Sequence, residues 1–483
     1  VPEIALTPRL AGLLRGRFGN DVAILHSALG VGERRDEWWR IRGGEARVVV
    51  GARAAALAPV EKIGLVVVDE EHDSAYKQDE SPRYHGRDVA VVRGQIEGCP
   101  VLLGSATPSV ESQTNALKGK YTRLVLPERI GDRALPVVEV VDRRLMIKAG
   151  GDPILGPDLR SALAARLDRG EQALVLLNRR GYATSLLCRE CGQEAACPNC
   201  SVSLTLHRGG SRALCHYCGH DIRSPDVCPA CRGVYLRLTG YGTEKVVEAV
   251  QATVPAARVE RLDRDRASRR GVLAQVLARF EAGEIDVLVG TQMIAKGHDF
   301  PRVTLVGVVD ADVGLGLPDF RSAERTFQLL TQVAGRAGRG EVPGEVILQS
   351  HLPDHYALGF ACAQDYDGFF EREMEFRQTM GYPPGHRPRQ RHHSQQGRRR
   401  RRRGRRRPGP GAAPVGRGPV PGPRARPRPS RPDPQRAPLP GPPEGAPPLH
   451  AWSRAARAGG TPRRPPVAGG GGGRGSAVGD VGG

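Results

Sequence analysis

Four C-x-x-C pairs in the middle of the chain constrain its fold more than any other feature. They hold eight of the ten cysteines within residues 188–231. Two cysteines at this spacing can turn both sulfurs to one metal ion, so eight thiolates suffice for two tetrahedral Zn²⁺ sites. Clustered pairs in a chain without a secretion signal favour metal ligands over disulfides. The pairs are Cys188/Cys191, Cys197/Cys200, Cys215/Cys218 and Cys228/Cys231.

The spacing of these pairs leaves open which of them share an ion. Nested pairing joins the outer two and the inner two, whereas tandem pairing joins neighbours along the chain. Three histidines in the same stretch are interpreted as surface residues, because four complete pairs already supply the ligands. They are His207, His216 and His220.

Apolar runs rich in β-branched residues flank the cysteine pairs on both sides. They cover residues 47–51, 63–69, 101–104, 172–178, 287–290, 303–310 and 345–349. Such runs, joined through helices, predict parallel sheets that are buried on both faces. We therefore expect an α/β fold with two RecA-like parallel-sheet domains and a nucleotide cleft between them, the second domain carrying the cysteine-rich insertion. No apolar run is long enough to predict a membrane span.

The last part of the chain differs from the rest in composition. From His386 onward it contains 23 Arg, no Lys and three acidic residues, which accounts for the whole formal net charge of +20. Such a segment cannot bury enough apolar surface to fold, so we expect residues 386–483 to be disordered. It is interpreted either as a basic tail that binds nucleic acid without sequence preference or as out-of-frame translation. In both cases the net charge says nothing about the partners of the folded part.

An acidic motif follows the second of these apolar runs. Asp69-Glu70-Glu71-His72 comes directly after Val68. Ligands of parallel α/β sheets bind at this edge, so the first acid is expected to hold Mg²⁺ and the second to polarise an attacking water. Taken alone, the tetrapeptide also fits a solvated acidic turn.

Two further motifs follow in order along the chain. Gly104-Ser105-Ala106-Thr107-Pro108 comes after another predicted strand, and Gln332-Val-Ala-Gly-Arg-Ala-Gly-Arg339 places Arg336 and Arg339 three positions apart. We expect the two Arg side chains to lie on one side of a helix start and to reach the γ-phosphate of a bound nucleotide. The three motifs together predict a nucleotide site.

The order of these motifs resembles that of DExH helicases, and finer strings narrow the resemblance to the PriA family of replication-restart DNA helicases. The resemblance covers residues 1 to about 384. The strings are Val1-Pro-Glu-Ile4, Tyr76-Lys-Gln78, Arg83-Tyr-His-Gly-Arg-Asp88, Leu177-Asn-Arg-Arg-Gly181, Ala295-Lys-Gly-His298 and Asp319-Phe-Arg-Ser-Ala-Glu-Arg325.

The resemblance implies a set of site residues. The implied catalytic residues are Asp69, Glu70, Glu71, His72, Gln332, Arg336 and Arg339. ATP with Mg²⁺ would contact Asp69, Glu70, Gly297, Arg336 and Arg339. The nucleic acid would contact Thr7, Arg53, Thr243, Thr291 and Gln292. For zinc, the resemblance implies the nested scheme, with Cys188, Cys191, Cys228 and Cys231 on one ion and Cys197, Cys200, Cys215 and Cys218 on the other.

The activity implied by the resemblance is ATP-dependent 3′→5′ unwinding of DNA in replication restart, with remodelling of stalled forks and initiation of primosome assembly. The implied partners are forked or branched DNA, primosome proteins and single-strand-binding proteins. The implied state is a monomer in the bacterial cytoplasm, associated with the nucleoid and not with a membrane.

The family's phosphate loop, G-x-x-x-x-G-K-[ST], does not occur in the sequence. We expect it upstream of Val1, since the chain begins without Met inside a structured segment, and we expect this chain alone to show little or no ATPase activity. A second function therefore stays open, an ATPase-inactive scaffold that binds branched DNA and primosome partners without unwinding. A generic RNA helicase is the third reading, which the cysteine-rich insertion disfavours.

The predicted domains follow from these assignments. Residues 1–125 form a first RecA-like motor domain without the phosphate loop, and residues 126–350 form a second one with a zinc-binding insert at 188–231. Residues 351–385 begin a C-terminal domain, in which the segment Phe369–Glu375 is predicted to be helical.

Overall fold

The computed structural model describes most of the chain before residue 386. The described residues are 1–2, 7–126, 135–148, 154–177, 186–188, 191, 195–199, 203–207, 211–216, 218–228, 230–233, 235–237, 242–267, 271–295, 300–315, 317, 319–340 and 342–385. The chain divides into two units, residues 1–390 and 391–483. The second unit, which contains most of the predicted tail, lies outside the described residues. None of the described helices has the length and apolar character that a membrane span requires.

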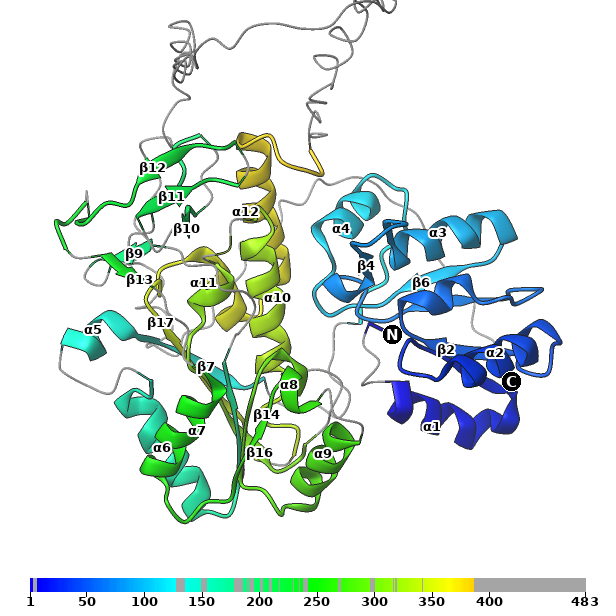
Figure 1. Ribbon diagram of the computed structural model, residues 1–483, viewed down its shortest axis with the longest axis horizontal. Coiled ribbons are helices and arrows are strands. Elements are labelled where there is room, and N and C mark those ends of the chain that lie inside the picture. Colours follow the sequence, from blue (N-terminus) through cyan, green and yellow to red (C-terminus); the bar gives the residue numbers. More distant parts are fainter. Residues whose placement is uncertain are drawn as a thin grey trace, which may run out of the picture. The chain divides into compact units, whose positions relative to one another are not determined.

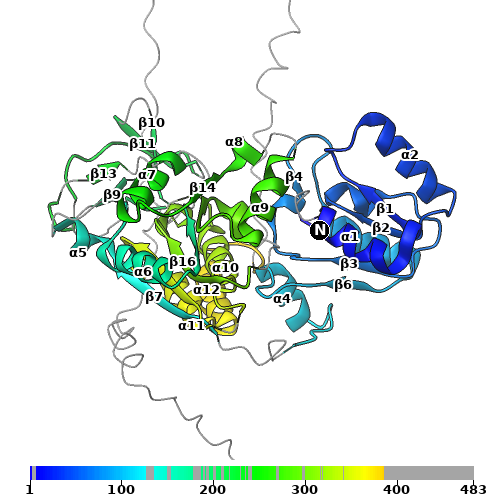
Figure 2. The same cartoon turned by 90° about the horizontal axis from the view of Figure 1, so that it is seen from below.

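Residues 7–126 form the first lobe, which is built around two pairs of parallel strands (Figures 1 and 2). In one pair, β1 runs beside β2, and in the other β3 runs beside β6. The strands are β1 (Val22–Leu25), β2 (Val48–Gly51), β3 (Val66–Val68) and β6 (Val101–Leu103), with a small antiparallel pair of β4 (Lys77–Gln78) and β5 (Tyr84–His85). The helices are α1 (Thr7–Phe18), α2 (Val31–Arg42), α3 (Gly86–Glu97) and α4 (Val110–Leu117), with 3-10 turns η2 (Gly19–Asp21), η3 (Arg53–Leu57) and η4 (Ser74–Tyr76).

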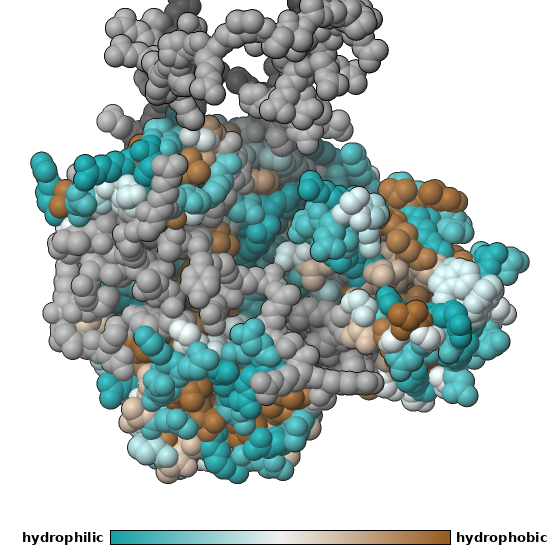
Figure 3. All heavy atoms as spheres, in the orientation of Figure 1, coloured by the Kyte–Doolittle hydropathy of each residue, from teal (hydrophilic) through white to brown (hydrophobic). Residues whose placement is uncertain are grey.

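Burial on both faces, which the sequence predicted for every sheet, is wrong for the β3–β6 pair. Val67 and Leu102 are register partners, and their side chains remain 60% and 47% exposed. The alternate residue Val68 points the other way and packs in a small cluster with Tyr76 and Ala90. Because neighbouring residues of a strand face opposite sides, the described elements cover only one face of this pair. Apolar surface is accordingly visible over this lobe in Figure 3.

Residues 135–385 contain the second lobe, a six-stranded parallel sheet in the order β14-β15-β8-β16-β17-β7. Its strands are β7 (Val137–Asp142), β8 (Gln172–Leu176), β14 (Val259–Leu262), β15 (Val287–Gly290), β16 (Val303–Val308) and β17 (Glu345–Ser350). Its helices are α5 (Arg143–Lys148), α6 (Pro157–Asp168), α7 (Thr243–Thr253), α8 (Arg264–Ala267), α9 (Val272–Ala282), α10 (Ser322–Ala334), α11 (Tyr356–Ala363) and α12 (Tyr366–Thr379), with 3-10 turns η6 (Gln292–Ala295) and η7 (Asp312–Gly314).

The central strands of the second sheet are buried on both faces, as their apolar runs predicted. In β8, Leu174 and Leu176 join one core cluster, while Ala173 and Val175 join the other. Helices α6 and α7 cover the second of these clusters, and α9, α10, α11 and α12 cover the first (Figure 1). The predicted parallel-sheet α/β class is confirmed here.

The predicted helix around Phe369–Glu375 is part of α12. Its residue Phe369 is buried and stacks on Phe327 of α10, with ring centroids 4.1 Å apart. Helices α11 and α12 therefore pack directly against the core of the second sheet. Whether residues 351–385 also begin a separate C-terminal domain stays a prediction.

The cysteine-rich insertion lies between β8 and α7 and contains two small antiparallel sheets. β9 (Leu186–Cys188) pairs with β13 (Tyr235–Arg237), which brings the beginning and the end of the insertion together. Between them, β10 (Thr205–His207), β11 (Arg212–Leu214) and β12 (Asp221–Arg223) form a three-stranded sheet.

Candidate functional site

The turn after β3 holds Glu70 in a strained backbone conformation. Its φ of 45° lies in the left-handed region, which costs a non-glycine residue about 1 kcal/mol or more. One carboxylate oxygen of Glu70, Oε2, is buried and has no hydrogen-bond partner among the described residues. Oε2 also lies 3.6 Å from Nδ1 of His72. A carboxylate with remaining acceptor capacity at the carboxyl end of a parallel strand fits a ligand site.

Asp69 is held through both its main chain and its side chain. The hydroxyl of Tyr76 donates a hydrogen bond of 2.7 Å to the Asp69 carbonyl oxygen, and the carboxylate Oδ1 accepts from the Glu70 amide. Burial raises the pKa of Tyr76 far above its usual value, and the surrounding carboxylates, Asp69 foremost, raise it further. Tyr76 therefore stays a hydrogen-bond donor. Sequence reasoning quoted it only as part of a family string and missed this role.

Glu71 is the most buried of the three acids, with a side chain only 1% exposed. Oε1 accepts from the Ser109 amide at 2.6 Å, and Oε2 accepts from the Ser112 hydroxyl at 2.9 Å and from Arg87 at 2.8 Å. Burial lowers the pKa of Arg87, but Glu71 and Asp88 more than offset this and hold it above its usual value. With its oxygens occupied in this way, Glu71 is a positioning residue that joins the acidic turn to α4, and it is not a free metal ligand.

His72 connects the other two predicted motifs. Its Nδ1 lies 2.6 Å from the Ser105 hydroxyl, and its Nε2 lies 3.2 Å from Nε2 of Gln332. The Gln332 amide can only donate from nitrogen, so His72 Nε2 accepts and Nδ1 carries the proton. The acidic turn, the Ser105–Thr107 segment and the Gln332–Arg339 motif thus meet at one imidazole.

The predicted position of the two arginines on a helix start is wrong. Helix α10 ends at Ala334, so Arg336 and Arg339 follow its carboxyl end in a turn. Gly338 has a φ of 69°, and a Cβ there would approach the Gly344 amide nitrogen to 2.4 Å, so the tight turn requires glycine. Arg336 is 8% exposed, and Arg339 donates from Nε to the Gly335 carbonyl.

The residues predicted to contact nucleic acid lie in both lobes. Arg53 donates to the carbonyl oxygens of Ala75 and Lys77, and its guanidinium lies 5.9 Å from the Tyr84 ring centre. Thr243 begins α7, is fully buried, and its hydroxyl donates to Asp263, which leaves its amide as the group that the predicted phosphate contact would use. Thr291 and Gln292 follow β15 and are half-buried. Gly297 and the side chain of Thr7 lie outside the described residues.

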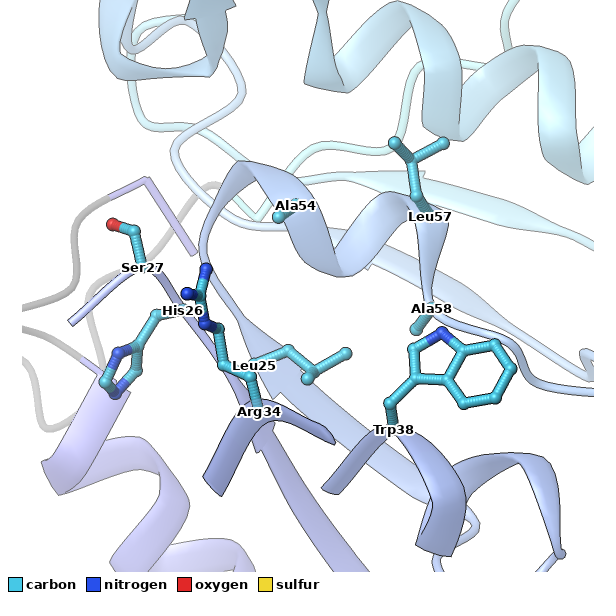
Figure 4. Close-up of a pocket in the computed structure, with 8 residues that line it drawn as sticks. All are labelled: Leu25, His26, Ser27, Arg34, Trp38, Ala54, Leu57 and Ala58. Atoms are coloured by element: carbon cyan, nitrogen blue, oxygen red, sulfur yellow. The ribbon is translucent and has the colours of Figure 1, made fainter. Parts of the chain in front are cut away.

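A pocket that the sequence did not predict lies at the carboxyl ends of β1 and β2. It is lined by Leu25, His26, Ser27, Arg34, Trp38, Ala54, Leu57 and Ala58. Figure 4 shows the Trp38 ring beside Ala58 at one end of the pocket and His26 with Ser27 at the other. Burial lowers the pKa of His26, more than the Glu33 carboxylate raises it. An indole and a guanidinium at one pocket offer stacking on a base and pairing with a phosphate.

The cysteines form two separate clusters in the nested order. The sulfurs of Cys188, Cys191, Cys228 and Cys231 lie within 4.8 Å of one another, as do those of Cys197, Cys215 and Cys218. Cys200 lies outside the described residues, and the described cysteines form no disulfide. A Zn²⁺ ion with four sulfurs at about 2.3 Å requires sulfur separations of roughly 3.8 Å. The separations of 3.5 Å for Cys188–Cys231, 3.7 Å for Cys191–Cys228 and 3.6 Å for Cys197–Cys218 fit this.

Comparison with known families identifies the class of the second lobe. A model described as "Helicase conserved C-terminal domain" matches residues 248–341, which include α10 and the Gln332–Arg339 motif. A second model, "PriA DNA helicase Cys-rich region (CRR) domain", matches residues 197–223, which contain the inner cysteine cluster. The second lobe therefore matches the conserved C-terminal domain of helicases, and its insertion matches the cysteine-rich region of PriA helicases.

Curated relatives narrow the assignment. "Replication restart protein PriA" of Bacillus subtilis (strain 168) is 49% identical over 384 residues, 80% of this chain and 48% of the relative. The Synechocystis sp. protein of the same name is 46% identical over 395 residues, 80% of this chain and 47% of the relative. Over the matched part, the chain is similar to members of the PriA family. It spans about half the length of these relatives.

Solved structures are less similar. "Structure of RecG bound to three-way DNA junction" matches with a TM-score of 0.42 and 17% identity, covering 77% of this chain and 39% of that chain. A likeness at this level supports no argument about the site.

Proposed function

We propose that the protein acts in replication restart as an ATP-dependent 3′→5′ DNA helicase that remodels stalled forks and initiates primosome assembly. The observation that supports this most is the meeting of three motifs at His72, with Ser105 at 2.6 Å and Gln332 at 3.2 Å. A nucleotide bound beside Asp69 and Glu70 could thereby influence both lobes. The family relationship supports the choice of DNA and of replication restart.

In the proposed site, each group has a chemical role. Asp69 and Glu70 offer hard oxygen ligands to Mg²⁺ and an acceptor for water. Arg336 and Arg339 supply positive charge for the phosphates, and Gln332 positions His72. ATP with Mg²⁺ is the proposed cofactor, and Gly297 is proposed to lie against it. Glu71 serves indirectly, through its hydrogen bonds to the Ser109 amide and the Ser112 hydroxyl.

The proposed partners are forked or branched DNA, primosome proteins and single-strand-binding proteins. We propose a monomer that works in the bacterial cytoplasm at the nucleoid. Backbone amides near Thr7, Thr243, Thr291 and Gln292 are proposed to hold phosphates, which positions a strand without reading its sequence.

The pocket beside Trp38 extends this proposed track. Trp38 lines the pocket whereas the adjacent Trp39 does not, although both are exposed. Fluorescence anisotropy with labelled single-stranded DNA should therefore show weaker binding for Trp38→Ala, by about tenfold for a lost stacking contact. Trp39→Ala is the matched control. Equal binding by the two variants would remove the pocket from the track.

Hydrolysis tests the motor assignment. In the protein expressed from its complete gene, Glu70→Gln should reduce DNA-stimulated ATP hydrolysis by about 100-fold or more, the loss typical for a group that activates water. Equal rates of ATP hydrolysis in wild type and variant would contradict the assignment of this site as the motor's hydrolytic site. We further infer that the 483-residue chain alone hydrolyses ATP poorly, because its sequence contains no G-x-x-x-x-G-K-[ST] loop to cradle the phosphates.

The scaffold alternative predicts a different result. If the protein only assembles DNA and partners, the complete gene product binds a forked DNA as tightly with Glu70→Gln as without it and shows no DNA-stimulated hydrolysis in either form. The same pair of proteins therefore separates the two functions.

A further inference from the structure

Three polar residues of α10 contact the first lobe at four-residue spacing. Glu324 accepts the Val110 amide through Oε1 at 2.9 Å, and Gln328 donates to the Thr107 carbonyl at 3.4 Å. Gln332 contacts His72. Residues four apart lie above one another on a helix, so one face of α10 contacts the start of α4, the Ser105–Thr107 segment and the acidic turn. We call Glu324, Gln328 and Gln332 the α10 polar row.

An ion cluster holds the Glu324 end of this row. The guanidinium of Arg377, on α12, is fully buried and pairs with Glu324 Oε2 at 2.7 Å and with Glu373 Oε1 at 2.7 Å. It also lies 3.8 Å from Glu111 of α4. The Tyr356 hydroxyl donates to the second oxygen of Glu373 at 2.6 Å. The cluster thus joins α4 to α10, α11 and α12.

Aromatic rings shield the cluster from water. The Phe320 ring lies 5.1 Å from the Arg377 guanidinium and 5.0 Å from that of Arg321, and it stacks on Tyr382. Arg321 in turn pairs with Glu111, so the first lobe contributes a carboxylate that two arginines share. Arg377, Glu324 and Glu373 are at most 4% exposed, so the exclusion of water strengthens their ion pairs and makes the loss of one partner costly. The pair of Arg321 with Glu111 is more exposed.

The charge state of Glu324 follows from this arrangement. Burial acts to raise the pKa of Glu324, but the guanidinium groups of Arg377 and Arg321 hold it below its usual value. Glu324 therefore stays ionised while it accepts the Val110 amide at the beginning of α4. Negative charge at this end also favours the helix dipole of α4.

We propose that Glu324 and Arg377 are positioning residues that fasten the beginning of α4 to α10 and so keep His72 and the Ser105–Thr107 segment in register with Gln332. A cluster that merely stabilised the second lobe would link α10, α11 and α12 and leave α4 untouched. Here Val110 and Glu111 of α4 are direct partners. The positioning itself does not depend on the proposed function. The inference rests on that function only where the position of His72 is taken to matter for ATP hydrolysis.

Hydrogen–deuterium exchange of the full 483-residue chain tests the proposal without nucleotide or DNA, so its outcome is independent of the hydrolysis assay. Arg377→Met and Glu324→Ala should each speed exchange of the α4 amides, residues 110–117, at least tenfold, while the amides of β16 keep their wild-type rates. Arg372→Met is the matched control, since Arg372 lies on the same helix and pairs only with exposed Glu375 among the described residues.

Two milder variants separate positioning from general destabilisation. Glu324→Gln keeps an oxygen that can accept the Val110 amide, so that amide should exchange more slowly than in Glu324→Ala. Glu111→Gln alters only the first-lobe partner and should speed exchange of α4 with the second sheet unchanged. Wild-type exchange of α4 in Glu324→Ala and Glu111→Gln, or an equal effect of Arg372→Met, would overturn the proposal. Faster exchange of α4 and β16 together in every variant would also overturn it.

Discussion

Nε2 of Gln332 lies 3.2 Å from Nε2 of His72, although 260 positions separate the two residues along the chain. His72 is almost completely buried, with a side chain 5% exposed. A nitrogen acceptor buried there without its donor carries a desolvation cost. This one contact links the acidic turn of the first lobe to the helicase motif of the second.

Gln332→Leu should therefore lower the free energy of unfolding by about 1–2 kcal/mol, because the buried His72 nitrogen loses its donor and leucine offers none. Urea denaturation measures the change. Arg325→Leu is the matched control, because Arg325 is exposed and lies on the same helix. Thr331→Leu would not serve, because the hydroxyl of Thr331 is buried. Equal stabilities of Gln332→Leu and Arg325→Leu would contradict the contact.

The two adjacent acids Glu70 and Glu71 should differ in stability effect. Glu71→Gln removes the charge from a buried carboxylate that pairs with Arg87, which should cost about 3 kcal/mol. Glu70→Gln keeps the strained backbone and changes a carboxylate whose buried Oε2 has no hydrogen bond among the described residues and lies 3.6 Å from His72 Nδ1, so its effect should stay within about 0.5 kcal/mol. Equilibrium unfolding in urea compares them directly. If Glu70→Gln lowered the free energy of unfolding more than Glu71→Gln, our assignment of Glu71 as the structural acid and Glu70 as the ligand-facing acid would be reversed.

Zinc content should reflect two independent sites. We expect two Zn²⁺ ions per chain, and one ion in Cys228→Ser, because the outer cluster loses a thiolate while the inner cluster keeps its ligands. Cys215→Ser should likewise leave one ion. Elemental analysis by mass spectrometry counts the metal. Loss of both ions in each variant would show that the clusters do not bind separately.

His355 gives the second lobe a pH-dependent stability. Burial lowers the pKa of His355 to about 4, and its Nδ1 accepts the Ala357 amide as the N-cap of α11. Between its unfolded pKa of about 6.5 and the folded value, the unfolded chain binds the proton and the folded chain does not. Stability should therefore fall as the pH drops from about 6.5 toward 4, by at most about 3 kcal/mol.

His355→Asn keeps a side-chain acceptor at the cap and removes the titration, so its stability should vary less over this pH range. Thermal unfolding of both proteins at pH 7, 6, 5 and 4.5 makes the comparison. If the stability of wild type and variant fell equally with decreasing pH, His355 would be excluded as the source of the pH dependence.

Much of the fold could be predicted because its signals are local. The run at 287–290 became β15 without change, and the run at 345–349 became β17 with one more residue. The acidic turn could be placed for the same reason, since it directly follows the valine run that forms β3. The C-x-x-C spacing likewise identified the metal ligands as a group.

The features that were missed depend on contacts between distant segments. Strand β7 (Val-Val-Glu-Val-Val-Asp) lies at the sheet edge beside β17, which no local pattern specifies. Arg377 and Glu373 look like surface charges of an amphipathic helix, and only packing against α10 buries them. Glu71 was grouped with the catalytic acids because its two serine partners lie 38 and 41 positions away.

The pairing of β9 with β13 brings the two ends of the cysteine-rich insertion together. Leu186 and Arg237 are register partners, so the polypeptide leaves and re-enters the second lobe across a single strand pair. None of the described strands of the insertion takes part in the parallel order β15-β8-β16. The cysteine-rich insertion could therefore be enlarged, exchanged or lost as one unit during evolution, while the six-stranded sheet of the second lobe keeps its strand order.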